Sequence, residues 1–135
     1  MIKIGIDPDV TKSGVALKDK AKIELYNMSF FKLFDYLQTF QGIKDVEVYV
    51  ECGFLNKSNW HKVNGSNSVN AQIGQRTGAN HEVAKKICEM CEYLGLTHFK
   101  VKPTKSKVNA EFFRQITKIE QRTNQEQRDA FMIIY

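Results

Sequence analysis

The chain has 135 residues, of which 42% are hydrophobic and only 2 are prolines. This length and composition exclude a disordered chain and a small disulfide-stapled scaffold, and we expect residues 1–135 to form a single domain. Lys and Arg number 20 against 15 Asp and Glu, which gives a formal charge of +5. That balance favours a polyanionic partner such as nucleic acid, without identifying one.

The three cysteines carry no secreted-scaffold spacing. Cys88 and Cys91 form a Cys-x-x-Cys pair, but they lie in an apolar stripe at helical spacing, and no second pair stands at zinc-site spacing. We therefore interpret them as reduced core thiols, which indicates a cytoplasmic protein. The first residues lack the features of a signal peptide, and no apolar run is long enough to span a membrane, so we expect no membrane partner.

The first third of the chain predicts three strands. Ile2, Ile4 and Ile6 alternate with polar or small residues up to Asp7, and this period of two is typical of a strand. Two further strands are predicted around 15–17 and over 22–28. Because the connections between these strands are short, the sequence predicts an antiparallel meander.

The rest of the chain predicts alternating helices and strands. A helix over 30–40, which Gly42 ends, separates the third strand from a fourth over 46–51, and such a crossing suits a parallel pairing. A helix over 71–94, a fifth strand over 97–101, and helices over 108–117 and from 124 to the end follow. The order predicts an α/β fold with a mixed five-stranded sheet flanked by helices.

Two of the predicted strands end in a carboxylate. Asp7 and Glu51 each follow three aliphatic residues that alternate along the strand, and each belongs to the face opposite those residues. If the two strands are neighbours, the carboxylates lie side by side at one edge of the sheet. Like charges that close repel and, when buried, raise each other's pKa, a cost that a divalent cation between them removes.

A second acidic pair, Glu126 and Asp129, opens the last predicted helix. Acids three residues apart share a helical face, and Asp129 directly precedes the apolar run 130–134. Carboxylate oxygens suit Mg²⁺ or Mn²⁺, whereas no Cys/His cluster favours zinc. Each acid alone also fits a solvated strand end or a contact with the helix dipole. The order of all four favours a metal site.

These acids stand in segments that resemble the motifs of RuvC-type Holliday-junction resolvases, which belong to the ribonuclease-H-like superfamily. The first family motif is similar to Ile4-Gly5-Ile6-Asp7-Pro8 with Ser13-Gly14-Val15, and the second to Val50-Glu51 with Phe54 three residues later. The glycine-bearing helix start that follows is similar to residues 72–78, and the final acidic pair to Glu126-x-x-Asp129-Ala130. The likeness spans nearly the whole chain, although Asp9 stands where the family usually has a glycine.

The resemblance implies a ribonuclease-H-like fold, a homodimer, and an Mg²⁺-dependent endonuclease that makes paired incisions in four-way DNA junctions. It implies that Asp7, Glu51, Glu126 and Asp129 are the catalytic metal ligands of a two-metal phosphodiester hydrolysis, with ions about 3.5–4 Å apart. Mn²⁺ is expected to substitute for Mg²⁺. Products with 5′-phosphate and 3′-hydroxyl ends follow from the same likeness.

A basic cluster surrounds Pro103, in a region where the family carries basic residues that assist cleavage. It includes Lys102, Lys105 and Lys107, and either of the last two fits the family's alignment as a catalytic lysine. Such a lysine neutralises charge on the phosphate in the transition state. The competing interpretation is a solvated basic loop.

Four other residues are candidate DNA contacts. The resemblance suggests that Phe54 stacks on an unpaired base at the junction centre, although a core role fits the sequence equally well. Arg76, Arg122 and Arg128 are weaker candidates for contacts to the DNA backbone.

Two alternatives remain open. One is another ribonuclease-H-like nuclease that acts on RNA or on a different DNA structure, because the acids alone do not separate these substrates. The other is a DNA-binding module of the same fold without catalysis, against which the four intact acids argue. An actin-like nucleotide-binding fragment needs a second domain to enclose its ligand, and the chain is too short for one.

Overall fold

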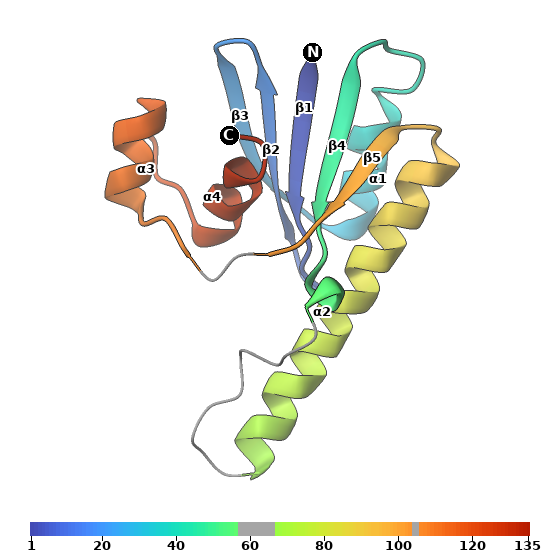
Figure 1. Cartoon of the computed structure of the whole chain (residues 1–135), viewed down its shortest axis with the longest axis vertical. Coiled ribbons are helices and arrows are strands. Elements are labelled where there is room, and N and C mark those ends of the chain that lie inside the picture. The colour runs from blue at the N-terminus through green and yellow to red at the C-terminus, as the bar shows by residue number, and fades with distance from the viewer. Residues whose placement is uncertain (57–66, 104–105) are drawn as a thin grey trace.

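The structure, a computed structural model, describes residues 1–56, 67–103 and 106–135. The order of its elements confirms the predicted order of strands and helices (Figure 1). The elements are β1 (Ile2–Asp7), β2 (Ser13–Asp19), β3 (Lys22–Met28), α1 (Phe30–Gln38), β4 (Val46–Glu51), the 3₁₀ turn η1 (Gly53–Leu55), α2 (Asn67–Tyr93), β5 (Thr97–Val101), α3 (Ala110–Thr117) and α4 (Gln125–Met132).

The strands form one mixed five-stranded sheet in the order β3-β2-β1-β4-β5, which confirms the predicted α/β fold. The pairs β1–β2 and β2–β3 are antiparallel, as the short connections predict. The pairs β1–β4 and β4–β5 are parallel. The helical crossing after β3 therefore suits a parallel pairing, but the partner of β4 is β1 rather than β3, because α1 carries the chain past β2 to the free edge of β1.

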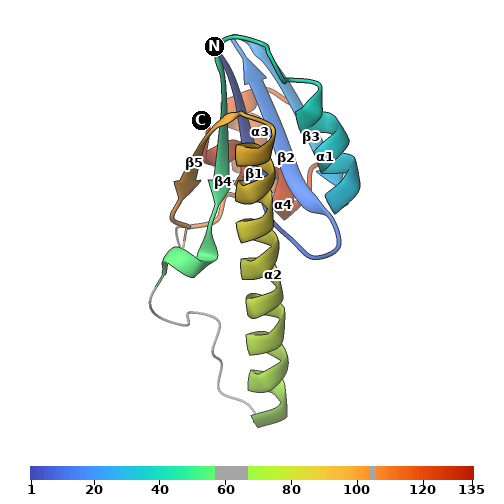
Figure 2. The same ribbon diagram turned by 90° about the vertical axis from the view of Figure 1, so that its right-hand side faces the viewer.

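Helices cover both faces of the sheet (Figures 1 and 2). On one face, the alternating aliphatic residues of β1 and β4 pack against α1 and α2, in a core that includes Ile4, Ile6, Val48, Val50, Leu33, Leu37, Ile87, Cys88 and Cys91. On the other face, α3 and α4 contribute Phe113, Ala130 and Phe131 to a second core against Ala16 of β2. The two cysteines are thus buried core residues, as their helical spacing predicts.

Helix α2 is longer than predicted, because it begins at Asn67 rather than near residue 71. Gly74 and Gly78 lie within it, and a methyl group at either position would meet no atom within 4 Å. The first half of α2 extends past the end of the sheet, while the second half packs on β4 and β5 (Figure 1). In the parts of the chain that the structure describes, neither α2 nor any other helix has the length and apolarity to cross a membrane.

Candidate active site

Asp7 and Glu51 occupy neighbouring positions at the ends of two parallel strands. The register pairs Ile6 with Val50, so the acids that follow these residues come next to each other. Ile6 and Val50 are fully buried in the core against α1 and α2. Successive side chains of a strand alternate between faces, so Asp7 and Glu51 both belong to the opposite face, which α4 covers. The predicted adjacency of the two acids is confirmed.

Two glycines let α4 approach this end of the sheet. A Cβ atom on Gly5 would lie 2.0 Å from the carbonyl oxygen of Ala130, and one on Gly14 would lie 2.1 Å from that of Glu126. Only a residue without a side chain allows such contact between helix and strand backbones. Because Gly14 is the register partner of Asp7, the first turn of α4 lies directly beside the end of β1.

The start of α4 is held by a capping box. The Asn124 side chain accepts a hydrogen bond from the Gln127 backbone N–H at 2.9 Å, and the Gln127 side chain accepts one from the Asn124 backbone N–H at 3.1 Å. This reciprocal pair satisfies two donors at the helix start. It therefore fixes the turn from which Glu126 and Asp129 project.

The carboxylates interact electrostatically. Burial, and after it the negative charges of Glu51, Asp129 and, most weakly, Glu126, raise the pKa of Asp7 from its ordinary value of 3.8 to about 8, while Lys107 opposes this rise. Burial also raises the pKa of Glu51, with Lys107 lowering it and Asp129 raising it. A carboxylate with such a raised pKa favours a counter-cation when it is ionised.

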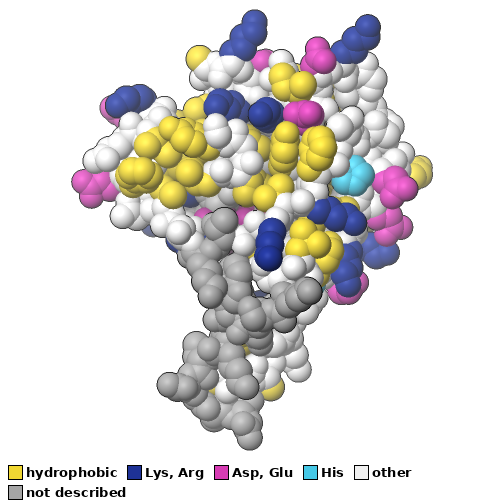
Figure 3. All heavy atoms as spheres, viewed as in Figure 1, with side chains coloured by type: hydrophobic (Ala, Val, Ile, Leu, Met, Phe, Trp, Pro, Cys, Tyr) yellow, Lys and Arg dark blue, Asp and Glu magenta, His cyan; other side chains and the backbone are white. Residues whose placement is uncertain are grey.

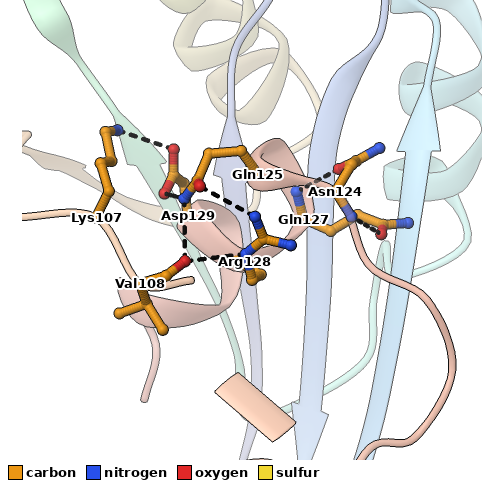
Figure 4. A network of polar contacts seen from close by, with 7 residues as sticks. All are labelled: Lys107, Val108, Asn124, Gln125, Gln127, Arg128 and Asp129. Carbon is orange, nitrogen blue, oxygen red and sulfur yellow. Dashed lines mark hydrogen bonds and ion pairs between the residues drawn. The ribbon is translucent and has the colours of Figure 1, made fainter. Parts of the chain in front are cut away.

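Asp129 is already engaged by two neighbours (Figure 4). Its Oδ2 atom lies 2.8 Å from Lys107 Nζ, and its Oδ1 atom accepts a hydrogen bond from Gln125 Nε2 at 2.8 Å. Burial acts to lower the pKa of Lys107, but the hydrogen bond to Asp129 and the nearby acids outweigh it and raise that pKa. Lys107 is therefore a charged ammonium that partly neutralises the acidic group.

A complete protein-only metal site is not formed. Among the described residues, no three Asp, Glu, His or Cys side chains lie close enough to one another to hold an ion. The metal site expected from the four acids is thus not assembled among these residues, and Lys107 and Gln125 contact the two oxygens of Asp129 instead. The donor set still fits Mg²⁺, which usually binds one or two carboxylates and completes its shell with water and substrate phosphates.

Phe54 lies one turn beyond Glu51, on η1, and contacts α2. Its ring is half-buried against the first core and meets the His81 ring edge-on, with centroids 6.4 Å apart. Lys85 Nζ lies 5.4 Å from the centroid of Phe54. Phe54 thus combines partial core packing with a basic neighbour. The sequence pattern did not single out His81 or Lys85, because nothing in it pairs α2 with η1.

Most of the other predicted contact residues are exposed or lie outside the described residues. Lys102 follows β5, Arg76 lies on α2 and Arg122 precedes α4, and all three are exposed. Lys105 lies outside the described residues, so Lys107 alone of the two candidate lysines is placed at the acids.

The face seen in Figure 1 also carries exposed hydrophobic side chains, with Lys and Arg side chains between them (Figure 3). Phe112 of α3 is 49% exposed, and Phe99 of β5 is 43% exposed. Phe99 stacks on Tyr49 with ring centroids 5.0 Å apart, and Lys3 Nζ lies 5.9 Å from the Tyr49 centroid. Aromatic rings with nearby cations are thus present on the face that carries the acids.

Comparison with known proteins identifies the fold. Neither a protein-family model nor a curated protein matches the chain. The chain is similar to a solved structure of Thermus thermophilus RuvC in complex with a Holliday junction substrate, with a TM-score of 0.55, 16% identity, and coverage of 98% of this chain and 89% of that chain. A second Thermus thermophilus RuvC structure gives a TM-score of 0.51 at 16% identity, covering 98% and 90% of the two chains. The chain has a RuvC-like fold.

Proposed function

We propose that this protein is an Mg²⁺-dependent endonuclease that cleaves branched DNA, with four-way junctions as its substrate. The observation that supports this most directly is the electrostatic coupling of four carboxylates and Lys107 at one end of the sheet. Mutual repulsion between carboxylates does not help to stabilise the end of a strand, whereas a phosphodiester hydrolase uses clustered carboxylates to bind its metal ions. The similar structure of RuvC contains a Holliday junction substrate, which favours branched DNA over RNA.

Each residue of the group has a role in this proposal. Asp7 and Glu51 hold the ion, and Glu126 and Asp129 complete its surroundings or hold a second ion. Bound Mg²⁺ lowers the pKa of a water molecule and withdraws charge from the phosphate. Lys107 stabilises negative charge on the phosphate, since its raised pKa keeps the ammonium protonated.

Phe54 and the basic residues form the proposed DNA contacts. Phe54 stacks on an unpaired base near the cleavage site, because its half-buried ring sits only three residues after Glu51. The exposed side chains of Arg76, Lys102 and Arg122 contact the DNA backbone, and we assign Lys105 to the same group from its position in the sequence.

The proposed active form is a homodimer in the cytoplasm. One chain carries one group of acids, whereas resolving a four-way junction takes two nicks on opposing strands, and a two-fold pair supplies both. The cytoplasmic location is consistent with three free cysteines, all buried in the described structure.

Cleavage of end-labelled four-way junctions, flaps and RNA/DNA hybrids in Mg²⁺ tests this proposal. We expect symmetric nicks in the junction, less than a few per cent of that activity for Asp7→Asn, and retained junction binding by this variant. The matched control is Asp35→Asn, which changes an exposed acid on α1 and is expected to cleave as the wild type does. Preferred cleavage of the hybrid would favour an RNA-directed nuclease, and cleavage of no substrate would favour a binding module.

A mixing experiment tests the dimer. Wild type mixed with an excess of Asp7→Asn should yield mainly singly nicked junctions among the cleaved products, because most dimers that contain an active subunit then contain only one. Light scattering with junction present should report two protomers per DNA. Paired nicking by a strict monomer would contradict the dimer.

A further inference from the structure

The loop that carries Lys107 and the helix that carries Asp129 are joined by a hydrogen-bonded group (Figure 4). Gln125 Nε2 donates to Asp129 Oδ1 at 2.8 Å and lies 3.4 Å from the carbonyl oxygen of Val108. Arg128 Nε donates to the same carbonyl oxygen at 2.9 Å. Since Val108 directly follows Lys107, this group, which we call the Gln125–Arg128 bracket, holds both partners of the Lys107–Asp129 ion pair.

Arg128 anchors the bracket through several acceptors at once. Besides the Val108 carbonyl, one terminal nitrogen donates to the carbonyl oxygen of Thr123 at 2.8 Å and to its hydroxyl at 3.0 Å, and the other donates to Gln125 Oε1 at 3.0 Å. A planar guanidinium with five donors allows this pattern, whereas a lysine ammonium does not reproduce it. Within the described residues Arg128 forms no ion pair, so its role here is geometric.

Arg128 also determines which way the Gln125 amide points. The Oε1 atom of Gln125 receives the Arg128 hydrogen bond, so its Nε2 group is turned toward Asp129. With Oδ1 of Asp129 held in this way, the carboxylate has a fixed orientation and presents Oδ2 to Lys107. Hydrogen bonds of this kind fix the orientation of ligating carboxylates, and their loss typically costs about 10- to 100-fold in metal affinity or activity.

We propose that Gln125 and Arg128 are positioning residues that set Asp129 and Lys107 relative to Asp7 and Glu51 for binding of a divalent cation. The proposal rests on the proposed function for its consequence in cleavage, but its direct consequence is cation affinity. Neither residue contacts the phosphate in this proposal. Both act through Asp129 and the loop that carries Lys107.

The test is calorimetric titration of the full chain with Mn²⁺, without DNA, alongside single-turnover cleavage of a four-way junction across a range of Mg²⁺ concentrations. The variants are Gln125→Leu, which removes the donor to Asp129, and Arg128→Lys, which keeps the charge and removes the planar fork. Matched controls are Gln115→Leu and Arg114→Lys, at exposed positions on α3. Thermal unfolding reports whether each variant is folded.

We expect both bracket variants to weaken Mn²⁺ binding at least about 10-fold and to raise the Mg²⁺ concentration for half-maximal cleavage by a similar factor, with the controls within twofold of wild type. The double variant should bind Mn²⁺ no more weakly than the weaker-binding single variant, because the two residues act as one unit. Should one variant unfold, the other carries the test.

Wild-type Mn²⁺ affinity in a folded Gln125→Leu or Arg128→Lys would overturn the proposal, as would full additivity in the double variant. The absence of Mn²⁺ binding by the wild type would also overturn it. Failure of the proposed function has a different signature. In that case the wild type binds Mn²⁺ and cleaves no junction, and the bracket variants still weaken Mn²⁺ binding.

Discussion

Replacing Asp7 by Asn should make the metal-free protein more stable while it removes the activity. Asp7 has a pKa of about 8 in the folded protein against an ordinary value of 3.8, so the folded state holds this proton far more tightly than the unfolded state. As pH rises from about 4 to 8, the unfolded chain ionises Asp7 freely and folding must keep the carboxyl protonated. Stability is therefore lost across this window, and Asn, which has no proton to lose, avoids that loss.

The size of the effect follows from the shift. A difference of about 4 pKa units corresponds to about 6 kcal/mol above pH 8, at about 1.4 kcal/mol per unit. At pH 7 about 3 of these pKa units contribute, so the gain in the free energy of unfolding is at most about 4 kcal/mol. Relaxation of the acids and entry of water lower this value, so we expect a gain of about 1–3 kcal/mol, or an increase in Tm of about 4–12 °C.

Thermal unfolding of wild type and Asp7→Asn in a chelator, from pH 4.5 to 8.5, measures this prediction. The difference in Tm should grow with pH and level off above about 8. Adding Mg²⁺ should raise the Tm of the wild type and leave the Tm of Asp7→Asn unchanged, so the difference in Tm between the two proteins should become smaller. Asp35→Asn is the matched control. A difference in Tm that is absent, or that does not depend on pH, would refute the assignment of Asp7 to a crowded acidic group.

Three further predictions concern the same site. Gly14→Ala should lower the free energy of unfolding by about 1–3 kcal/mol and weaken Mn²⁺ binding, because the new Cβ atom would meet the Glu126 carbonyl. Gly74→Ala, on an open surface of α2, should instead raise the free energy of unfolding by up to about 1 kcal/mol. Urea unfolding measures the stability of both variants, and calorimetry measures their Mn²⁺ binding. Mn²⁺ affinity should rise up to about tenfold per pH unit below pH 8, because binding displaces the Asp7 proton, and a flat calorimetric profile from pH 6 to 8 would contradict this. Lys107→Met should shift the pH–rate profile to higher pH, because Lys107 lowers the pKa of both Asp7 and Glu51. An unshifted profile would count against the position of Lys107 beside these acids.

The sheet and its two carboxylates could be predicted because period-two alternation states which face each strand residue occupies. Ile6 and Val50 belong to the buried face, so the acids after them belong to the other one. The pairing of β4 with β1 is a long-range choice that alternation does not encode, and the helical crossing pointed equally to β3. Alternation therefore predicts the local face of an acid, and topology decides which acids meet.

The contact of Asp129 with Lys107 and the contact of Arg128 with the neighbouring loop could not be predicted from the sequence. The hydrogen bond from Gln125 to Asp129 joins residues i and i+4 of one helix, a spacing that the sequence displays. The ion pair with Lys107 depends on the path of an irregular loop, for which no periodicity exists. The role of Arg128 depends on the Val108 carbonyl in the same loop. Residues that act through backbone carbonyls leave no pattern in the side chains.

The placement of Lys107 explains how an acidic group of this kind is stable before a metal ion binds. Burial and mutual repulsion raise the pKa of Asp7 and Glu51, and Lys107 lowers both. The lysine also engages the one Asp129 oxygen that Gln125 does not. A cation bound at Asp129 Oδ2 would compete with the Lys107 ammonium for that oxygen, and the Lys107 side chain is 51% exposed to solvent.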